Sequence, residues 1–205
     1  MVKKALITGA TGKIGREVCL ELARAGYDIA LHFHRSEDAA HKLADEISEM
    51  ERRVGVFMAD LSKANECSDL VKSVGDVDAF VHCASAFERT PFGEVTAEKF
   101  DEVIATEMRP AFLLVQTIGK NMREKGGSIV CFSDVAAEKP YANYLPYCMA
   151  KAGIDAMIKT IAKELAPDVR VNAIALERVA QSQKAASFVR EVIESTRTGE
   201  IICIP

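Results

Sequence analysis

Short apolar runs alternate with longer amphipathic stretches from one end of the chain to the other. The runs are rich in Val, Ile, Leu, Phe and Ala, and little polar sequence interrupts them. Continuous apolar runs of this kind are typical of strands that are buried on both faces. The predicted strands cover residues 3–8, 28–33, 54–59, 78–83, 128–133, 169–174 and 200–204.

The stretches between the runs show helical periodicity. They predict helices over residues 14–25, 36–50, 63–73, 97–125, 144–165 and 183–196, the fourth of them broken near Pro110. Gly26, Gly75 and Pro167 stand where helices are expected to end. Strands that alternate with helices pair in parallel through right-handed crossovers. We therefore expect an α/β fold, a Rossmann-like doubly wound sheet of seven parallel strands with helices on both faces.

The length and charge of the chain narrow the class of protein. Its 205 residues predict one domain over residues 1–205, because a domain usually holds about 100–200 residues. The 26 Lys and Arg against 30 Asp and Glu give a net charge of −4, and a slightly acidic chain is a poor binder of nucleic acid. No apolar run approaches the roughly 18–20 residues that a membrane span needs, and the run after Lys4 is too short for a signal peptide.

The six cysteines form no C-x-x-C pair, so a zinc or thioredoxin-like site has no support and no metal is expected. Cys83 and Cys131 lie in apolar runs, where free thiols are commonly buried. Unpaired thiols are typical of a reducing compartment, and we expect a cytoplasmic protein.

A glycine-rich turn follows the first predicted strand and reads Thr8-Gly9-Ala10-Thr11-Gly12-Lys13-Ile14-Gly15. Glycines here let the backbone approach a pyrophosphate closely, and the following helix N-terminus offers free N–H groups and a positive dipole end. The turn lacks the Gly-Lys-Ser/Thr ending of a Walker loop. The predicted dinucleotide contacts are Gly9, Thr11, Lys13, Ile14 and Gly15, and the alternative is a plain tight turn.

The second predicted strand ends in the cationic segment His34-Arg35-Ser36. A chain that binds NAD usually places Asp or Glu here, to hold the ribose 2′-hydroxyl. A cationic strand end instead suits the 2′-phosphate of NADP, with Lys13 as a further positive charge. The segment predicts NADP(H) as the cofactor, and a solvated polar strand end is the alternative.

Tyr147 and Lys151 stand four residues apart and share one face of a predicted helix. A tyrosine hydroxyl with an ordinary pKa near 10 is a poor proton donor at neutral pH. A nearby ammonium group stabilises the phenolate, and we expect Lys151 to lower the pKa of Tyr147. Such pairs also occur on many surface helices.

These motifs together resemble the short-chain dehydrogenase/reductase family. The resemblance rests on the glycine turn, on Tyr147 and Lys151, and on Leu165-Ala166-Pro167-Asp168-Val169-Arg170-Val171-Asn172, in the family's order and spacing. It implies that Tyr147 donates a proton to the substrate and that Lys151 holds the nicotinamide ribose. It also places Asp60 against the adenine, with Leu61 and Ala84 beside the cofactor.

Within the family, the chain is similar to the pteridine reductase and dihydromonapterin (dihydrofolate) reductase branch. Asp134 stands 13 positions before Tyr147, where most relatives carry serine and this branch carries aspartate. The branch implies that Ser85 and Phe87 hold a pterin, which would stack between Phe87 and the nicotinamide, and that Lys13 replaces an arginine. Ordinary core packing for Phe87 and a turn cap for Asp134 are the alternatives.

Two positions depart from the family pattern. Glu107 stands where the family has an asparagine that supports a water chain to the lysine, and it could hold a water or pair with Lys151 or Arg109. After Ala175 the chain passes almost directly into the last helix, so the fold is expected to be whole except for a shortened substrate lid.

The motifs predict an NADPH-dependent oxidoreductase that reduces a pterin- or dihydrofolate-like small molecule, with Tyr147 as the proton donor and Asp134 beside it. One alternative is a carbonyl reductase of the 3-oxoacyl type, and another is a catalytically weak NADP-binding protein. The resemblance also implies a homodimer or homotetramer, while the charge and the lack of a long apolar run predict no nucleic acid or membrane partner.

Overall fold

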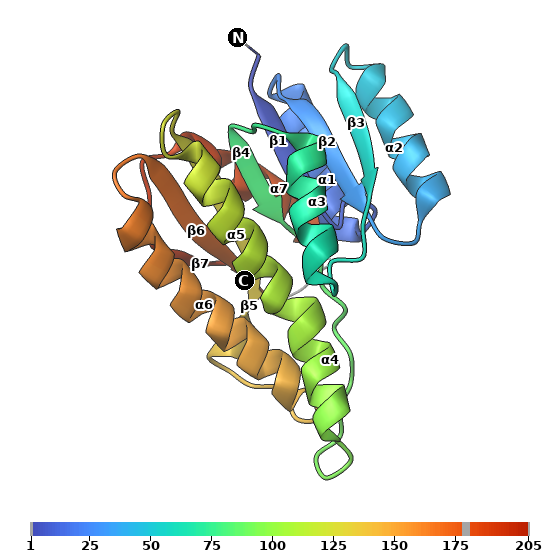
Figure 1. Cartoon of the computed structure of the whole chain (residues 1–205), viewed down its shortest axis with the longest axis vertical. Coiled ribbons are helices and arrows are strands. Elements are labelled where there is room, and N and C mark those ends of the chain that lie inside the picture. Colours follow the sequence, from blue (N-terminus) through green and yellow to red (C-terminus); the bar gives the residue numbers. More distant parts are fainter. Residues whose placement is uncertain (1, 178–180, 205) are drawn as a thin grey trace.

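Seven parallel strands form one sheet in the computed structural model, which describes residues 2–177 and 181–204. The strands lie in the order β3-β2-β1-β4-β5-β6-β7 (Figure 1). Their bounds are β1 (Lys4–Thr8), β2 (Asp28–Phe33), β3 (Val54–Met58), β4 (Ala79–His82), β5 (Gly127–Asp134), β6 (Val169–Leu176) and β7 (Ile201–Ile204). The predicted α/β architecture of seven parallel strands is confirmed.

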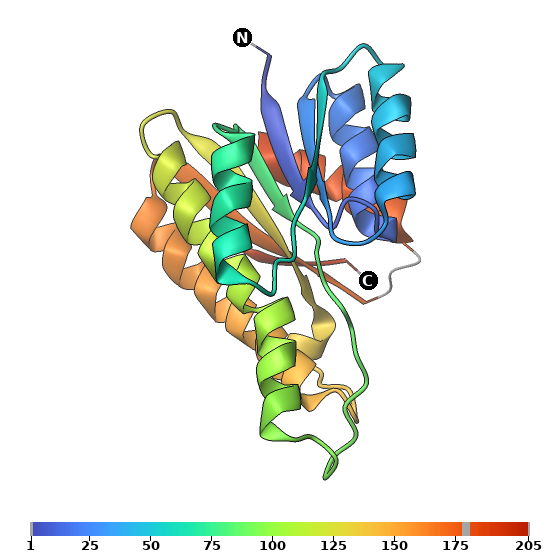
Figure 2. The same cartoon turned by 45° about the vertical axis from the view of Figure 1, so that its right-hand side comes forward.

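Helices cover both faces of the sheet (Figure 2). One face carries α1 (Lys13–Arg24), α2 (Glu37–Ser48) and α7 (Ser182–Glu194). The other face carries α3 (Ala64–Val74), α5 (Arg109–Met122) and α6 (Leu145–Leu165). Helix α4 (Ala97–Glu107) extends past the carboxyl ends of the strands (Figure 1), and a short 3-10 turn, η1 (Val135–Ala137), follows β5.

The sheet separates two hydrophobic cores, which explains why the strands are continuously apolar. Along β1, Ile7 faces the core under α1 and α2, while its neighbour Leu6 faces the core under α3 and α5. Both side chains are almost fully buried. Burial of one such side chain stabilises the fold by about 1.5–3 kcal/mol, so successive strand residues stabilise opposite layers.

The predicted boundaries differ from the observed ones by a few residues, with physical reasons. The predicted break near Pro110 is present, because α4 ends at Glu107 and α5 begins at Arg109. Pro110 lies in the first turn of α5, where its missing N–H leaves no hydrogen bond unmade. Strands β5 and β6 run further than their apolar sequence predicts, because Asp134 still pairs in register with Leu176.

The strand order changes direction between β1 and β4, and the loops after these strands diverge there. Ligands of doubly wound sheets bind at such a switch point, outside the carboxyl ends of the strands. None of the described helices is long and apolar enough to cross a membrane. Among residues 2–177 and 181–204, no group of three or more His, Cys, Asp or Glu side chains is placed to hold a metal ion.

Candidate active site

The glycine turn packs tightly between β4 and α1. Gly9 has a φ of +66°, and a Cβ there would lie 2.8 Å from the backbone of Ala84. A Cβ on Gly15 would lie 2.2 Å from the carbonyl oxygen of Gly9. Gly12 is the N-cap of α1 and supplies no side-chain cap, so the first N–H groups of the helix stay open to a ligand. This geometry fits an anionic group such as a pyrophosphate.

His32 of β2 accepts two hydrogen bonds from the glycine turn. The N–H of Gly9 donates to His32 Nδ1 over 3.2 Å, and the N–H of Ala10 donates to the His32 carbonyl oxygen over 2.9 Å. Since Nδ1 accepts, Nε2 carries the proton and donates to the Ala59 carbonyl oxygen, 3.1 Å away. Burial lowers the pKa of His32 to about 4, which keeps the ring neutral. Sequence reasoning missed this role; the signal was a polar residue inside an apolar strand.

A cavity of about 680 Å³ lies on the β2 side of the turn and gathers most of the predicted adenosine-binding residues. Its lining includes Thr11, His34, Arg35, Ser36, Asp60, Leu61 and Ala84. Asp60 Oδ1 accepts hydrogen bonds from the N–H and the hydroxyl of Ser62, which lower the pKa of that carboxyl group. His34 Nε2 lies 3.9 Å from the same oxygen.

A second cavity, of about 370 Å³, lies on the β5 side of the turn. Lys13, Ile14 and Gly15 line it from α1, so Lys13 lies here and not beside His34 and Arg35. The facing residues are Ser85, Phe87, Asp134, Tyr141, Tyr147 and Lys151. Gly9, Gly12, Cys83 and Ser85 line both cavities, which therefore form one two-lobed hollow across the glycine turn. A hollow of this form, with cations in one lobe, fits a phosphorylated dinucleotide.

Asp134 binds two tyrosines in the smaller lobe. The hydroxyl of Tyr147 donates to Asp134 Oδ2 over 2.8 Å, and the hydroxyl of Tyr141 donates to Oδ1 over 3.0 Å. The N–H of Ala136 also donates to Oδ1, so Asp134 caps η1 as well. The turn-cap alternative and the predicted contact with Tyr147 are therefore both present. Tyr141 was missed, since its distance along the chain follows no helical spacing.

The expectation that Lys151 lowers the pKa of Tyr147 is wrong for this structure. Burial raises the pKa of the Tyr147 hydroxyl, and the charge and hydrogen bond of Asp134 raise it further. Lys151 Nζ lies 5.3 Å from the centre of the Tyr147 ring and donates to the Phe132 carbonyl oxygen. It also pairs with Glu107 Oε2 at 3.2 Å, which offsets its positive charge. Tyr147 therefore holds its proton firmly.

Phe87 forms an aromatic wall with two tyrosines at the start of α6. Its ring stacks on Tyr144 with centroids 4.6 Å apart and planes 11° apart, and it meets the edge of Tyr147 at 4.9 Å. The Phe87 side chain is 49% exposed, so the core-packing alternative does not describe it. Ser85, the other predicted substrate contact, lines the same lobe, but its hydroxyl donates to Glu107.

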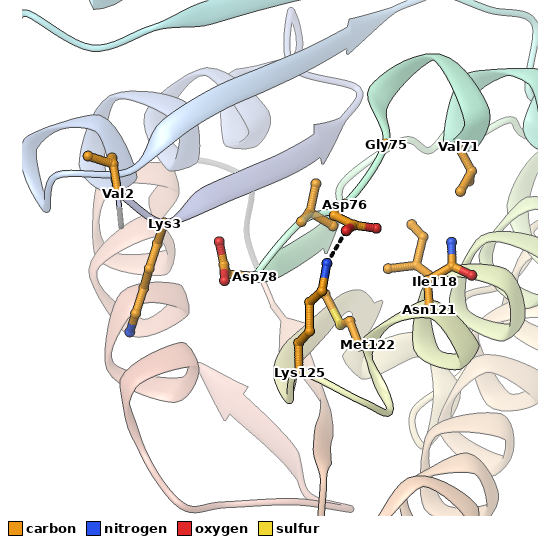
Figure 3. Close-up of a pocket in the computed structure, with 11 residues that line it drawn as sticks. Val2, Lys3, Val71, Gly75, Asp76, Asp78, Ile118, Asn121, Met122 and Lys125 are labelled. Atoms are coloured by element: carbon orange, nitrogen blue, oxygen red, sulfur yellow. Dashed lines mark hydrogen bonds and ion pairs between the residues drawn. The ribbon is translucent and has the colours of Figure 1, made fainter.

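The predicted shortened lid falls between β6 and α7, where residues 178–180 lie outside the described residues. Another cavity, of about 250 Å³, opens at the amino ends of β1 and β4 (Figure 3). There Lys125 pairs with Asp76 beside Asp78, and no predicted site residue takes part.

The chain matches a family of known proteins over most of its length. The family model of short chain dehydrogenases matches residues 3–191. The 3-oxoacyl-[acyl-carrier-protein] reductase of Staphylococcus epidermidis is 30% identical over 181 residues, which cover 85% of this chain and 74% of that protein.

Two solved structures share the whole architecture. Acetoin dehydrogenase from Enterobacter cloacae superposes with a TM-score of 0.92 at 25% identity, over 100% of this chain and 94% of that one. FolM alternative dihydrofolate reductase 1 from Brucella suis, in complex with NADP, superposes with a TM-score of 0.88 at 25% identity, over 98% of this chain and 92% of that one. The glycine turn, the Tyr147–Lys151 pair and these matches lead to one conclusion: the chain belongs to the short-chain dehydrogenase family of nicotinamide-dependent oxidoreductases.

Proposed function

We propose that the protein is an NADPH-dependent reductase of a pterin- or dihydrofolate-like small molecule. The observation that carries this proposal is the Asp134 carboxylate, bonded to Tyr141 and Tyr147 in a lobe that Phe87 also lines. A flat heterocycle favours an aromatic face, and its ring N–H groups favour a carboxylate acceptor. The FolM alternative dihydrofolate reductase from Brucella suis, of similar fold, supports this reading.

Reduction of a C=N bond needs a hydride on carbon and a proton on nitrogen. The bound cofactor would supply the hydride. Tyr147 is the proposed proton donor, because its hydroxyl lies in the lobe that Asp134 and Phe87 also line. Asp134 orients that hydroxyl through its 2.8 Å hydrogen bond, and Lys151 is proposed to hold the nicotinamide ribose.

Preference for NADPH over NADH is proposed from the larger lobe. His34, Arg35 and Ser36 place two nitrogen-bearing side chains and a hydroxyl at the end of β2, where a 2′-phosphate would bind. Asp60, Leu61 and Ala84 are proposed to surround the adenosine. The Brucella suis structure contains NADP, which agrees with this choice.

A second candidate is a carbonyl reductase of the 3-oxoacyl type. The similarity to the 3-oxoacyl-[acyl-carrier-protein] reductase of Staphylococcus epidermidis favours it. The same proton donor would serve a ketone, but Asp134 stands where most of the family carries the serine hydroxyl. The branch resemblance therefore favours the pterin-like substrate.

The test is NADPH oxidation with dihydrobiopterin, dihydromonapterin, dihydrofolate and an acetoacetyl thioester, run on the wild type and on Tyr147→Phe. We expect turnover of at least one pterin, and a fall in kcat of about 10²–10⁴-fold in Tyr147→Phe, because general acid catalysis contributes that much. We expect Tyr147→Phe still to bind NADPH, with a fluorescence titration as the measurement.

Two other outcomes would each support an alternative function. Preferred turnover of the thioester would replace the pterin reading with the carbonyl one. Tight NADPH binding without turnover of any substrate would identify the catalytically weak alternative. A single domain, a homo-oligomer and a cytoplasmic location remain proposals that accompany the pterin reading.

A further inference from the structure

Glu107 is a buried carboxylate at the end of α4, and only 1% of the residue is exposed. It receives donors from two separate elements. Lys151 of α6 lies 3.2 Å from its Oε2. The loop after β4 supplies the Ser85 hydroxyl, at 2.8 Å from Oε2, together with the N–H groups of Ala86 and Phe87 on Oε1. One side chain thus binds both walls of the smaller lobe.

The loop needs such an anchor because its conformation is strained. Phe87 has a φ of +42°, a region that a bulky residue occupies only when the surroundings impose it. Its N–H donates to Glu107 Oε1 over 3.3 Å, and its ring stacks on Tyr144. The carboxylate therefore helps to set the direction in which the Phe87 ring points.

The same carboxylate offsets the charge of Lys151. The Lys151 ammonium is also buried, with Phe132 carbonyl oxygen as its other acceptor. The negative charge of Glu107 is one of the causes that raise the pKa of Tyr147. If Glu107 lost its charge, Lys151 would act on Tyr147 uncompensated, and the phenol would lose its proton more readily.

We propose that Glu107 is a positioning residue with two separable actions: Oε1 anchors the loop that carries Phe87, and Oε2 sets the position and effective charge of Lys151. The proposal concerns the reductase activity proposed above for this site and rests on it for its kinetic readouts. Neither Arg109 nor a bridging water is needed, because Arg109 donates to the Ser62 carbonyl oxygen and the Lys151 contact is direct.

Two substitutions separate the actions. Glu107→Gln keeps an oxygen for the Ala86 and Phe87 N–H groups but turns an NH2 group, a donor, toward Lys151. Glu107→Met removes both acceptors at similar length. Glu98→Gln is the matched control, since Glu98 lies exposed in the first turn of the same helix.

We expect Glu107→Gln to lower kcat about tenfold, since one hydrogen bond to a charged group is worth about that factor. The alkaline limb of the pH profile of kcat should move to lower pH. KM should stay within about twofold of the wild-type value. Glu107→Met is expected also to raise KM about tenfold. Glu98→Gln should match the wild type in all of these. A higher KM in Glu107→Gln with unchanged kcat and pH profile would overturn the proposal.

Amide hydrogen exchange of residues 84–88 tests the anchor without any substrate. We expect wild-type protection in Glu107→Gln and at least tenfold faster exchange in Glu107→Met. Should Glu107→Met not fold, the charge-balanced double variant Glu107→Met, Lys151→Met serves instead, with the same fast exchange expected. Wild-type protection in the methionine variants would refute the anchor. If no substrate is turned over, the proposed function fails while this measurement still decides the role of Glu107.

Discussion

At the scale of single residues, two buried neutral histidines make the fold sensitive to acid. His32 accepts the Gly9 N–H at Nδ1, and His82 Nδ1 forms a 2.8 Å hydrogen bond with the Thr8 hydroxyl. Burial lowers the pKa of His32 to about 4 and that of His82 to about 3. Both titrate near 6.5 in an unfolded chain, so the unfolded chain binds protons first as the pH falls. The neutral histidines therefore stabilise the folded state fully above pH 6.5. This stabilisation is lost as the pH falls from 6.5 to the pKa that each histidine has in the folded protein.

We predict that each histidine lowers the free energy of unfolding by about 2 kcal/mol between pH 7 and pH 5, at 1.36 kcal/mol for each pH unit below 6.5. Urea denaturation at the two pH values measures this loss. In His32→Gln the loss should shrink by about that amount, because glutamine does not titrate. His41→Gln, at an exposed position on α2, is the control. Its free energy of unfolding should fall between pH 7 and pH 5 by as much as that of the wild type. An unchanged pH dependence in His32→Gln would refute the prediction.

At the scale of elements, the start of α1 depends on glycine. A Cβ at position 15 would lie 2.2 Å from the Gly9 carbonyl oxygen, so Gly15→Ala must displace the glycine turn. We predict at least a tenfold rise in the Kd for NADPH, measured by fluorescence titration. Gly26→Ala is the comparison: Gly26 has a φ of +91° with open space around it, so alanine costs about 1–3 kcal/mol of stability and leaves binding unchanged. Equal binding in wild type and Gly15→Ala would contradict the geometry.

The end of β2 is predicted to select the cofactor. Arg35 lines the larger lobe, and a hydrogen bond from its guanidinium to a phosphate would be charge-assisted, worth about 1.5–3 kcal/mol. Arg35→Ala should therefore reduce the ratio of NADPH to NADH affinity about tenfold or more. Arg24→Ala, in the last turn of α1, should leave that ratio unchanged. The proposed preference would be excluded if Arg35→Ala kept the wild-type ratio.

Elements were more predictable from the sequence than contacts. The continuous apolar run of β2 and the 21-residue length of α6 are visible in the sequence itself, so their type and position could be predicted directly. The partners of Glu107 could not, because Ser85 and Lys151 approach it only through tertiary packing. The same holds for Tyr141, which reaches Asp134 by way of η1, and for the pKa of Tyr147, which depends on how the Lys151 charge is offset. Local sequence contains neither distance nor burial.

At the scale of the whole molecule, the helices after β4 and β5 present apolar side chains to the outside. Phe112 of α5 is 43% exposed and Met149 of α6 is 49% exposed. We predict a homodimer or homotetramer through these helices, with sedimentation velocity as the measurement. Phe112→Glu should lower the sedimenting mass, while Phe92→Glu, on the loop before α4, should not. A monomer for the wild-type protein would remove the prediction.

The stacked rings of Phe87 and Tyr144 bear on the thermodynamics of ligand binding. The two rings already stack on each other, and Phe87 already has its left-handed backbone conformation, in the structure without substrate. The conformational entropy of these residues is therefore lost during folding and not when the ligand binds. For a rigid planar ligand, calorimetry should then show little entropic penalty, because the site is preorganised, and a negative heat-capacity change, because apolar surface is buried.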